Sequence, residues 1–186
     1  MNKLIITSDG SHTLYSNTFR EYYHSMYGAV TESKHVFIKN GLYFFKDKPV
    51  TIFEIGFGTG LNAFLTCLEA NKHNRPVIYY AIEKYPLQTD DILALNYKNI
   101  VTSDKQESEI FTQLHAAEWG KLYAINANFS IYKIRSDISM YEPSFGYDLI
   151  YFDAFAPEKQ PEMWSYEIFN RLFNRLKKEE FLSLIV

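Results

Sequence analysis

The sequence is poor in cysteine, with Cys67 alone among its 186 residues. One cysteine cannot form a disulfide within the chain, which excludes a disulfide-stapled fold and suits a reducing cytoplasm. Cys67 lies in an apolar stretch, where a cysteine usually packs as a small core side chain instead of reacting. The five histidines show no paired spacing with cysteines or carboxylates. We therefore expect a cytoplasmic protein that binds no metal.

Long apolar runs and an excess of basic charge are also missing. The N-terminus, residues 1–6, has a short apolar patch that lacks the length of a signal peptide, and no run approaches a membrane span. The net charge is −3 and the isoelectric point is about 6.0. Proteins that bind nucleic acid usually carry a basic excess or a basic patch. The composition by itself therefore leans slightly against an RNA substrate.

What is present fits one soluble domain with a sizeable core, because 47% of the residues are hydrophobic and 22% are charged. No repeat or Pro/Gly-rich linker marks a second domain. Residues 4–45 mix polar and aromatic side chains, with turn signals at Asp9-Gly10 and Asn40-Gly41. We expect residues 1–48 to form a small β extension with a hairpin at Asp9-Gly10, packed on a core domain of residues 49–186.

From residue 49 onward, apolar strand patterns alternate with helical patterns. Such alternation predicts a mostly parallel sheet with helices on both faces. Ligands of these folds bind beyond the carboxyl ends of the strands, so the residues just after 55, 82, 134 and 152 are the candidates for a site. The expected strands are 50–55, 77–82, 129–134, 147–152 and 181–186, and the expected helices are 61–71, 89–96, 107–118 and 162–178.

The first candidate is the glycine-rich turn after the first of these strands. It reads Glu54-Ile-Gly56-Phe-Gly58-Thr-Gly60, and glycines let the backbone turn tightly and approach a ligand closely. A dinucleotide fingerprint that starts at Gly56 needs another glycine where this chain has Leu61. The observed spacing is the one found in methyltransferases that use S-adenosyl-L-methionine, and it disfavours a nicotinamide oxidoreductase.

Two acidic residues close the next two strands. Glu83 follows the glycines by about 20 residues, where a carboxylate accepts hydrogen bonds from ribose hydroxyls. Asp137 comes just after the third strand, where a carboxylate can accept a hydrogen bond from the adenine amine. A surface turn is at least as good a reading of Asp137 taken alone.

The fourth strand ends at Asp153, followed by Ala, Phe155, Ala and Pro157. Methyltransferases that act on nitrogen place an acidic or amide group here, beside the methyl donor. The plain alternative is that Asp153 caps the next helix. The apolar residues that follow it make that alternative weaker.

Several separated motifs, in the same order along the chain, resemble the methyltransferases that perform the last step of 5-methylaminomethyl-2-thiouridine synthesis in tRNA. In many bacteria a similar domain is the N-terminal half of a bifunctional enzyme, fused to an FAD-dependent oxidase for which we expect no room here. The resemblance runs from about residue 8 to residue 178. The motifs are SDGSHTLY (8–15), ESKHVFI (32–38), EIGFGTGLN (54–62) and DAFAP (153–157), with Lys159, Pro161, Glu162 and Trp164 after it.

This resemblance implies a Rossmann-like class I fold, S-adenosyl-L-methionine as cofactor, and the anticodon loop of tRNA as partner. It implies that Asp153 holds the acceptor amine in catalysis and that Phe155 forms a wall of the pocket for the wobble base. The chain ends at Val186 and has no glycine in 177–181, so we expect the last two strands of a seven-stranded sheet to be missing. The residues implied in cofactor binding are Glu54, Gly56, Gly58, Gly60, Asn62, Glu83 and Asp137.

Two rival functions stay open at this point. A small-molecule N-methyltransferase or an aminopropyltransferase would use the same scaffold, and the acidic net charge favours either. A donor-binding protein without turnover is the reading that the short C-terminus favours.

Overall fold

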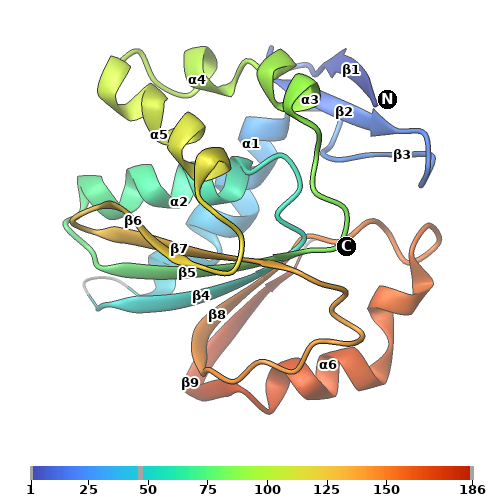
Figure 1. Cartoon of the computed structure of the whole chain (residues 1–186), viewed down its shortest axis with the longest axis vertical. Helices are drawn as coiled ribbons and strands as arrows, with labels where there is room; N and C mark the ends of the chain where they lie inside the picture. Colours follow the sequence, from blue (N-terminus) through green and yellow to red (C-terminus); the bar gives the residue numbers. More distant parts are fainter. Residues whose placement is uncertain (1, 46–47, 185–186) are drawn as a thin grey trace.

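Two sheets organise the chain (Figure 1), whose computed structural model describes residues 2–45 and 48–184. The small antiparallel sheet has the order β1-β2-β3 and the large sheet has the order β6-β7-β5-β4-β8-β9. Neighbours in the large sheet are parallel, except that β6 runs antiparallel to β7. The strands are β1 Lys3–Ile6, β2 His12–Ser16, β3 Glu21–Tyr22, β4 Val50–Ile55, β5 Val77–Glu83, β6 Leu122–Asn126, β7 Phe129–Arg135, β8 Tyr147–Phe152 and β9 Leu176–Leu184.

Helices cover both faces of the large sheet, with α1, α2 and α5 on one face and α6 on the other (Figure 1). This mostly parallel, helix-covered sheet confirms the predicted Rossmann-like fold class. No helix in the described ranges is long and apolar enough to cross a membrane. The helices are α1 Ala29–Ser33, a π-helix Lys34–Lys39, a 3-10 helix Leu42–Phe45, α2 Leu61–Lys72, α3 Thr89–Ala94, α4 Tyr97–Ile100, α5 Lys105–Ala116, a 3-10 helix Pro161–Trp164 and α6 Tyr166–Phe173.

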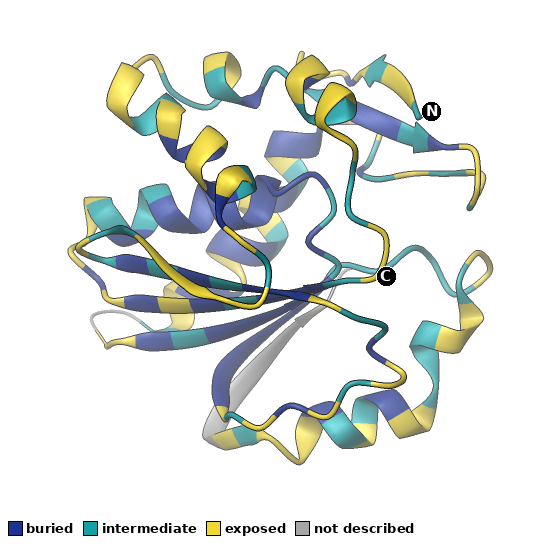
Figure 2. Cartoon of the chain, in the orientation of Figure 1, coloured by how far each residue is buried: buried dark blue, intermediate teal, exposed yellow. Residues whose placement is uncertain are grey.

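The centre of the large sheet is buried on both faces, as the dark strands of Figure 2 show. Successive side chains of a strand point to opposite faces, so each central strand contributes side chains to two hydrophobic cores. Ile52 and Leu149 pack in the core beneath α2 and α5. Phe53 and Ile150 pack in the core beneath α6. Burial on both sides explains why the strands read as nearly continuous apolar runs.

The N-terminal segment folds as the expected hairpin, with β1 and β2 joined through Asp9-Gly10. The Asp9 carboxylate accepts 2.9 Å hydrogen bonds from the backbone N–H groups of Ser11 and Thr31, which ties the hairpin to α1. Burial opposes ionisation, yet these hydrogen bonds hold the pKa of Asp9 well below its usual range. Leu14 of β2 belongs to the same core as the large sheet. The division at residues 48 and 49 stays a prediction.

The predicted helix at 162–178 is wrong in length. A 3-10 turn ends at Trp164, Ser165 caps a new helix by accepting a hydrogen bond from the N–H of Ile168, and that helix ends at Phe173. The chain then enters β9 at Leu176, earlier than the strand expected at 181–186, of which residues 185 and 186 lie outside the described residues. Lys177 pairs with Asp148 of β8 at 2.9 Å. Pairing with the sheet therefore overrides the local helical pattern.

The sequence pattern also did not predict β6, an antiparallel strand at the edge of the sheet. Its residues are half-buried or exposed, so it lacks the apolar run that identified the other strands. The edge pairing with β7 decides its conformation.

Candidate active site

The glycine turn after β4 is shaped by close backbone contact with the chain after β8. Gly56 has a φ of 92°, and a Cβ atom there would lie 2.5 Å from the backbone oxygen of Asp153. Gly60 has a φ of 74° and is the N-cap of α2. Side chains at these two positions would carry backbone strain. They would also collide, at Gly56 with the Asp153 backbone oxygen and at Gly60 with His115, whose Nε2 would lie 2.8 Å from the new Cβ. The turn therefore needs glycine for packing against the Asp153 backbone as well as for its curvature.

Behind this turn, Asn62 joins two acidic side chains. The side-chain Nδ2 of Asn62 donates hydrogen bonds to Glu54 Oε1 at 3.1 Å and to Asp153 Oδ2 at 2.7 Å. Glu54 and Asn62 are buried. Within the described part of the chain, the buried Oδ1 of Asn62 has no hydrogen-bond partner, whereas Glu54 also interacts with the hydroxyl of Tyr79. Buried oxygens without a partner favour the binding of a ligand that brings hydrogen-bond donors or positive charge.

The ionisation of this cluster is shifted toward the neutral acids. Burial, followed by the nearby Asp153, raises the pKa of Glu54 well above its usual value. Burial raises the pKa of Asp153 to about 7, against the opposing hydrogen bond from Asn62, and the charges of Glu32 and Glu83 add to the rise. A carboxyl group with a pKa near neutrality can hold or release a proton under ordinary conditions.

Glu83 and Asp137 lie at the carboxyl ends of β5 and β7, as predicted. Glu83 accepts hydrogen bonds from the backbone N–H groups of Gly58, at 3.0 Å, and Tyr85, at 2.7 Å. Asp137 forms an ion pair with Lys84 at 2.7 Å and accepts a hydrogen bond from the backbone N–H of Ser139. Burial opposes it, but these partners lower the pKa of Asp137. The two carboxylates are therefore held in place by the loops that follow their strands.

A cleft of about 450 Å³ opens along these strand ends, which face the right of Figure 1. Of the nine predicted site residues, seven line it, whereas Glu54 and Gly60 lie behind its wall. Six acidic side chains and one lysine line the cleft, so its charge favours a cationic or amine-bearing ligand. The seven predicted residues are Gly56, Gly58, Asn62, Glu83, Asp137, Asp153 and Phe155.

The N-terminal segment supplies a wall of the cleft that sequence reasoning missed. Phe19 packs its ring on Phe155, with 4.7 Å between ring centroids, and Tyr23 meets the same ring at 5.2 Å. Trp164 donates a 2.8 Å hydrogen bond from Nε1 to the carbonyl of Phe155. The signal available in the sequence was the density of aromatic residues at 19, 22 and 23. Aromatic residues from two other segments, residues 19–23 and Trp164, therefore contact Phe155.

His24, also from this segment, supports the glycine turn. It is buried between Thr13 and Thr59, with its ring nitrogens 3.3 Å and 3.4 Å from their hydroxyl oxygens. Burial lowers its pKa to about 4, so the ring is neutral near pH ~7. His115 approaches the carbonyl of Thr59 at 3.0 Å from α5, and burial lowers its pKa to about 4 as well. Two neutral histidines thus contact Thr59 of the glycine turn.

The residues of the cleft fit S-adenosyl-L-methionine. A side chain at Gly56 would collide with the Asp153 backbone, so this turn presents only backbone to the cleft. The partnerless Oδ1 of Asn62, which also lines the cleft, can accept a hydrogen bond. In residues 2–45 and 48–184, no cluster of three or more His, Cys, Asp or Glu side chains is placed to hold a metal ion.

Comparison with known proteins identifies the family. The model of a family described as S-adenosyl-L-methionine-dependent methyltransferase matches residues 90–183. The tRNA 5-methylaminomethyl-2-thiouridine biosynthesis bifunctional protein MnmC of Campylobacter fetus is 32% identical over 91% of this chain and 29% of that protein. Its counterpart in Leptospira interrogans is 31% identical over 96% of this chain and 29% of that protein.

The fold comparison agrees with the sequence comparison. The crystal structure of MNMC2 from Aquifex aeolicus superposes with a TM-score of 0.78 and 25% identity, over 99% of this chain and 59% of that one. The chain spans less than a third of the length of the curated relatives named above. With half of its length matched by the family model and its fold shared with a solved relative, the chain belongs to the family of S-adenosyl-L-methionine-dependent methyltransferases.

Proposed function

We propose that the chain methylates the amine of 5-aminomethyl-2-thiouridine at the wobble position of tRNA, giving 5-methylaminomethyl-2-thiouridine. The observation that carries the proposal is Asp153, a carboxyl group that Asn62 holds through a 2.7 Å hydrogen bond in an acidic cleft, which Phe155 also lines. The names of the relatives, which place them in the biosynthesis of this nucleoside, support the same substrate. The proposed location is the cytoplasm.

The donor would be held by residues from several strand ends. Gly56 and Gly58 would bring backbone close to it, and Glu83 would accept hydrogen bonds from its ribose. Asp137 would face the adenine, and the buried pair of Glu54 and Asn62 would lie behind the methionine end. When bound, the donor supplies a methyl group carried on a positively charged sulfonium sulfur.

Asp153 would act on the acceptor amine. It would orient the neutral amine toward the methyl group and stabilise the positive charge that grows on the nitrogen. A nearby carboxylate also raises the pKa of an amine, so Asp153 opposes deprotonation before transfer. With its own pKa near 7, Asp153 could take a proton from the methylated amine afterwards. Its main roles are therefore orientation and charge stabilisation.

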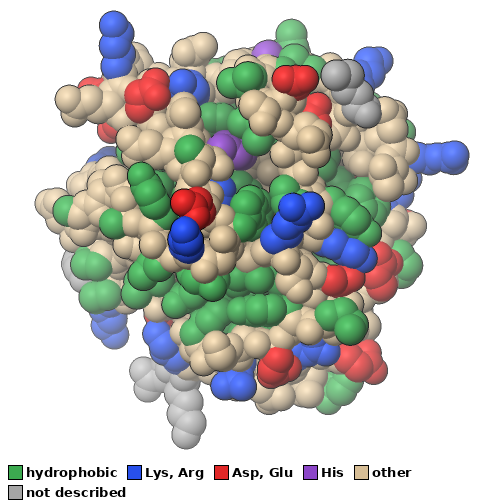
Figure 3. Space-filling view, in the orientation of Figure 1, with side chains coloured by type: hydrophobic (Ala, Val, Ile, Leu, Met, Phe, Trp, Pro, Cys, Tyr) green, Lys and Arg blue, Asp and Glu red, His purple; other side chains and the backbone are tan. Residues whose placement is uncertain are grey.

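Phe155 would form the wall against which the wobble base rests. A base in an anticodon loop can leave its stack and pack on an aromatic ring. Phe19 and Tyr23 already contact this ring, so the recess is apolar on more than one side. On the face drawn in Figure 3, basic side chains are scattered and hydrophobic ones form a band. Such a face suits recognition of tRNA through contacts with the wobble base more than through contacts with its phosphates.

A second candidate is N-methylation of a small amine, which the acidic cleft and the net charge of −3 favour. The two candidate substrates differ in whether the protein also contacts phosphate groups. Binding to tRNA releases counterions and weakens steeply as salt rises, whereas binding of a small amine has no such phosphate contribution.

The experiment is methyl transfer to tRNA that carries unmethylated 5-aminomethyl-2-thiouridine, followed by nucleoside mass spectrometry. Appearance of 5-methylaminomethyl-2-thiouridine is the expected result. The free nucleoside serves as the second acceptor, and the Asp153→Asn protein, for which we expect much slower turnover, serves as the matched control. Equal turnover of nucleoside and tRNA would favour the small-amine candidate. Folded protein that binds donor and yields no product from either acceptor would contradict both.

A further inference from the structure

The segment between β7 and β8, residues 136–146, forms one wall of the cleft. Ser136, Asp137 and Ile138 line the cleft directly. The segment contains neither helix nor strand, so the hydrogen bonds of a sheet or helix do not fix its path. Two local turns, from Met140 N–H to the Asp137 carbonyl and from Tyr141 N–H to the Ile138 carbonyl, give it shape. A backbone hydrogen bond from the Ser136 N–H to the Glu83 carbonyl, at 3.2 Å, anchors its start, and side chains from elsewhere hold the residues after it.

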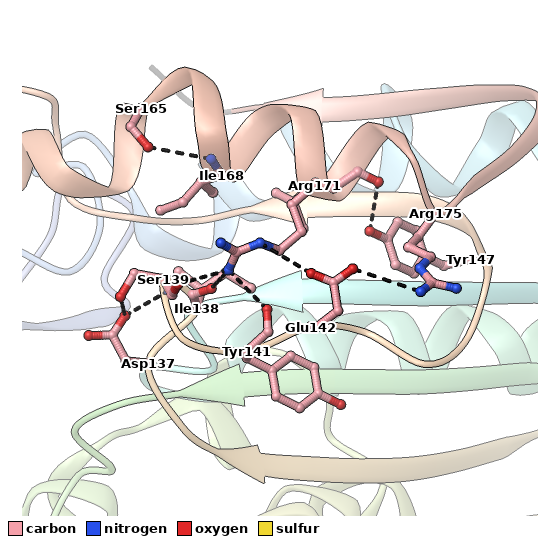
Figure 4. Close-up of polar contacts among 11 residues, drawn as sticks. Asp137, Ile138, Ser139, Tyr141, Glu142, Tyr147, Ser165, Ile168, Arg171 and Arg175 are labelled. Atoms are coloured by element: carbon pink, nitrogen blue, oxygen red, sulfur yellow. Dashed lines mark hydrogen bonds and ion pairs between the residues drawn. The ribbon is translucent and has the colours of Figure 1, made fainter.

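Arg171, in the last turn of α6, reaches this segment from behind (Figure 4). Its Nη1 donates to the carbonyls of Ile138 at 2.8 Å, Ser139 at 2.9 Å and Tyr141 at 3.1 Å. Nη1 carries two hydrogens, so one of them is shared between two carbonyls. The planar guanidinium stays charged and rigid, and it therefore holds the three carbonyls in one fixed arrangement.

Lys84 holds the same segment from the cleft side. Its ammonium group pairs with Asp137 at 2.7 Å, while Ile138, at 3% exposed, packs in the core beneath α6. Asp137 and Ile138 are thus held between a lysine at the end of β5 and an arginine on α6. The lysine contact is half-exposed, whereas the side chain of Arg171 is 25% exposed. Water competes less with the arginine contact than with the lysine contact.

We propose that Arg171 is a positioning residue of the donor site. By holding the carbonyls of residues 138, 139 and 141, it sets where Asp137 and Ile138 stand against the adenine end of the donor. The inference rests on the proposed donor site and does not depend on the identity of the acceptor. Helix α6 therefore serves the cofactor site from the opposite face of the sheet to α2.

The chain offers two matched controls. Arg175, just past the end of α6, faces Oε1 of Glu142 at 3.8 Å, while Arg171 Nε faces Oε2 of the same carboxylate at 3.4 Å. Arg175→Met removes a cation from this cluster and leaves the three carbonyl contacts of Arg171 intact. Glu142→Gln weakens both ion pairs and also leaves those carbonyl contacts intact.

The test is binding of S-adenosylhomocysteine by isothermal titration calorimetry, with a thermal melt of each protein as a check of folding. Arg171→Met should weaken binding about tenfold, and Arg171→Lys, which keeps the charge but loses the planar fork, should weaken it to a smaller extent. Arg175→Met and Glu142→Gln should stay within about twofold of the wild type. Where Arg171→Met does not fold, Arg171→Lys carries the test.

A second readout separates positioning from general stability. S-inosylhomocysteine has a carbonyl where adenine has its amine, so a well-placed Asp137 should disfavour it. The wild type should prefer the adenine ligand, and the Arg171 variants should lose much of this preference. An unchanged preference together with unchanged affinity would overturn the role of Arg171. An equal loss of affinity in Arg175→Met would do the same. A wild type that binds neither ligand would instead remove the donor site itself.

Discussion

Asn62 of α2 donates a 2.7 Å hydrogen bond to Asp153, a residue 91 positions further along the chain. The same amide also donates to Glu54, so the end of β4, the start of α2 and the end of β8 meet at one side chain. This contact fixes the orientation of the carboxyl group that we propose to hold the acceptor amine. Burial raises the pKa of both acids, and the nearby Asp153 raises the pKa of Glu54 further.

Removing the Asp153 carboxylate should affect turnover far more than donor binding. Asp153→Asn keeps an oxygen that can accept from Asn62, but it cannot carry the charge that stabilises a cationic amine. Loss of one such group typically costs about 10²- to 10³-fold in rate. Single-turnover methyl transfer and the dissociation constant of S-adenosylhomocysteine measure the two effects separately. Unchanged turnover would remove Asp153 from the catalytic residues.

The pH dependence of stability should also depend on Asp153. Its pKa rises from 3.8 to about 7 on folding, so between these values the folded state holds the proton more tightly than the unfolded state does. The stability that this proton contributes is present at low pH and is lost as the pH rises toward about 7.

Asp153→Asn cannot ionise, so its stability relative to the wild type should increase as the pH rises from ~4 to ~7 and then level off. The difference in melting temperature between the two proteins, measured across this range, tests the prediction. Glu54 is present in both proteins, so the comparison reports Asp153 and its coupling to Glu54. A difference that stays constant with pH would contradict the raised pKa.

The glycine at position 56 should be essential for both folding and donor binding. In Gly56→Ala the new Cβ would lie 2.5 Å from the Asp153 backbone oxygen, so the two turns must move apart. We expect a loss of about 2–4 kcal/mol in stability and at least about tenfold weaker donor binding. Gly120→Ala is the matched control, because Gly120 also has a positive φ, of 77°, yet has no atom within 4 Å of a new Cβ. That variant should be mildly destabilised and bind donor normally.

Phe155 should matter for the acceptor and hardly at all for the donor. Base stacking on an aromatic ring contributes about 1–3 kcal/mol, so Phe155→Ala should raise the KM for tRNA by roughly tenfold or more. Phe155→Tyr, which keeps the ring, should restore most of the affinity. Phe173→Ala, at a half-exposed position on α6, provides the control for loss of an aromatic side chain. An equal effect of Phe155→Ala on S-adenosylhomocysteine binding would place the ring in the donor site instead.

Much of the fold and the candidate site is determined by local sequence. Apolar runs fixed the central strands because these strands are buried on both faces. The alternating glycines fixed the turn at residues 56–60, since the conformations found at Gly56 and Gly60 are ones that other residues rarely adopt. Parallel strands end at one edge of the sheet, so the sequence order alone brought Glu83, Asp137 and Asp153 together.

Tertiary structure decided the rest, because the relevant contacts join segments that share no local pattern. Nothing near Phe19 or His24 in the sequence shows that they line the cleft, since their neighbours there come from residues 59 and 155. The end of α6 and the start of β9 were set by pairing with β8, which outweighs the apolar periodicity of that stretch. Arg171 looks like an ordinary surface charge in the sequence. Its role arises because the fold places three backbone carbonyls of another segment within its reach.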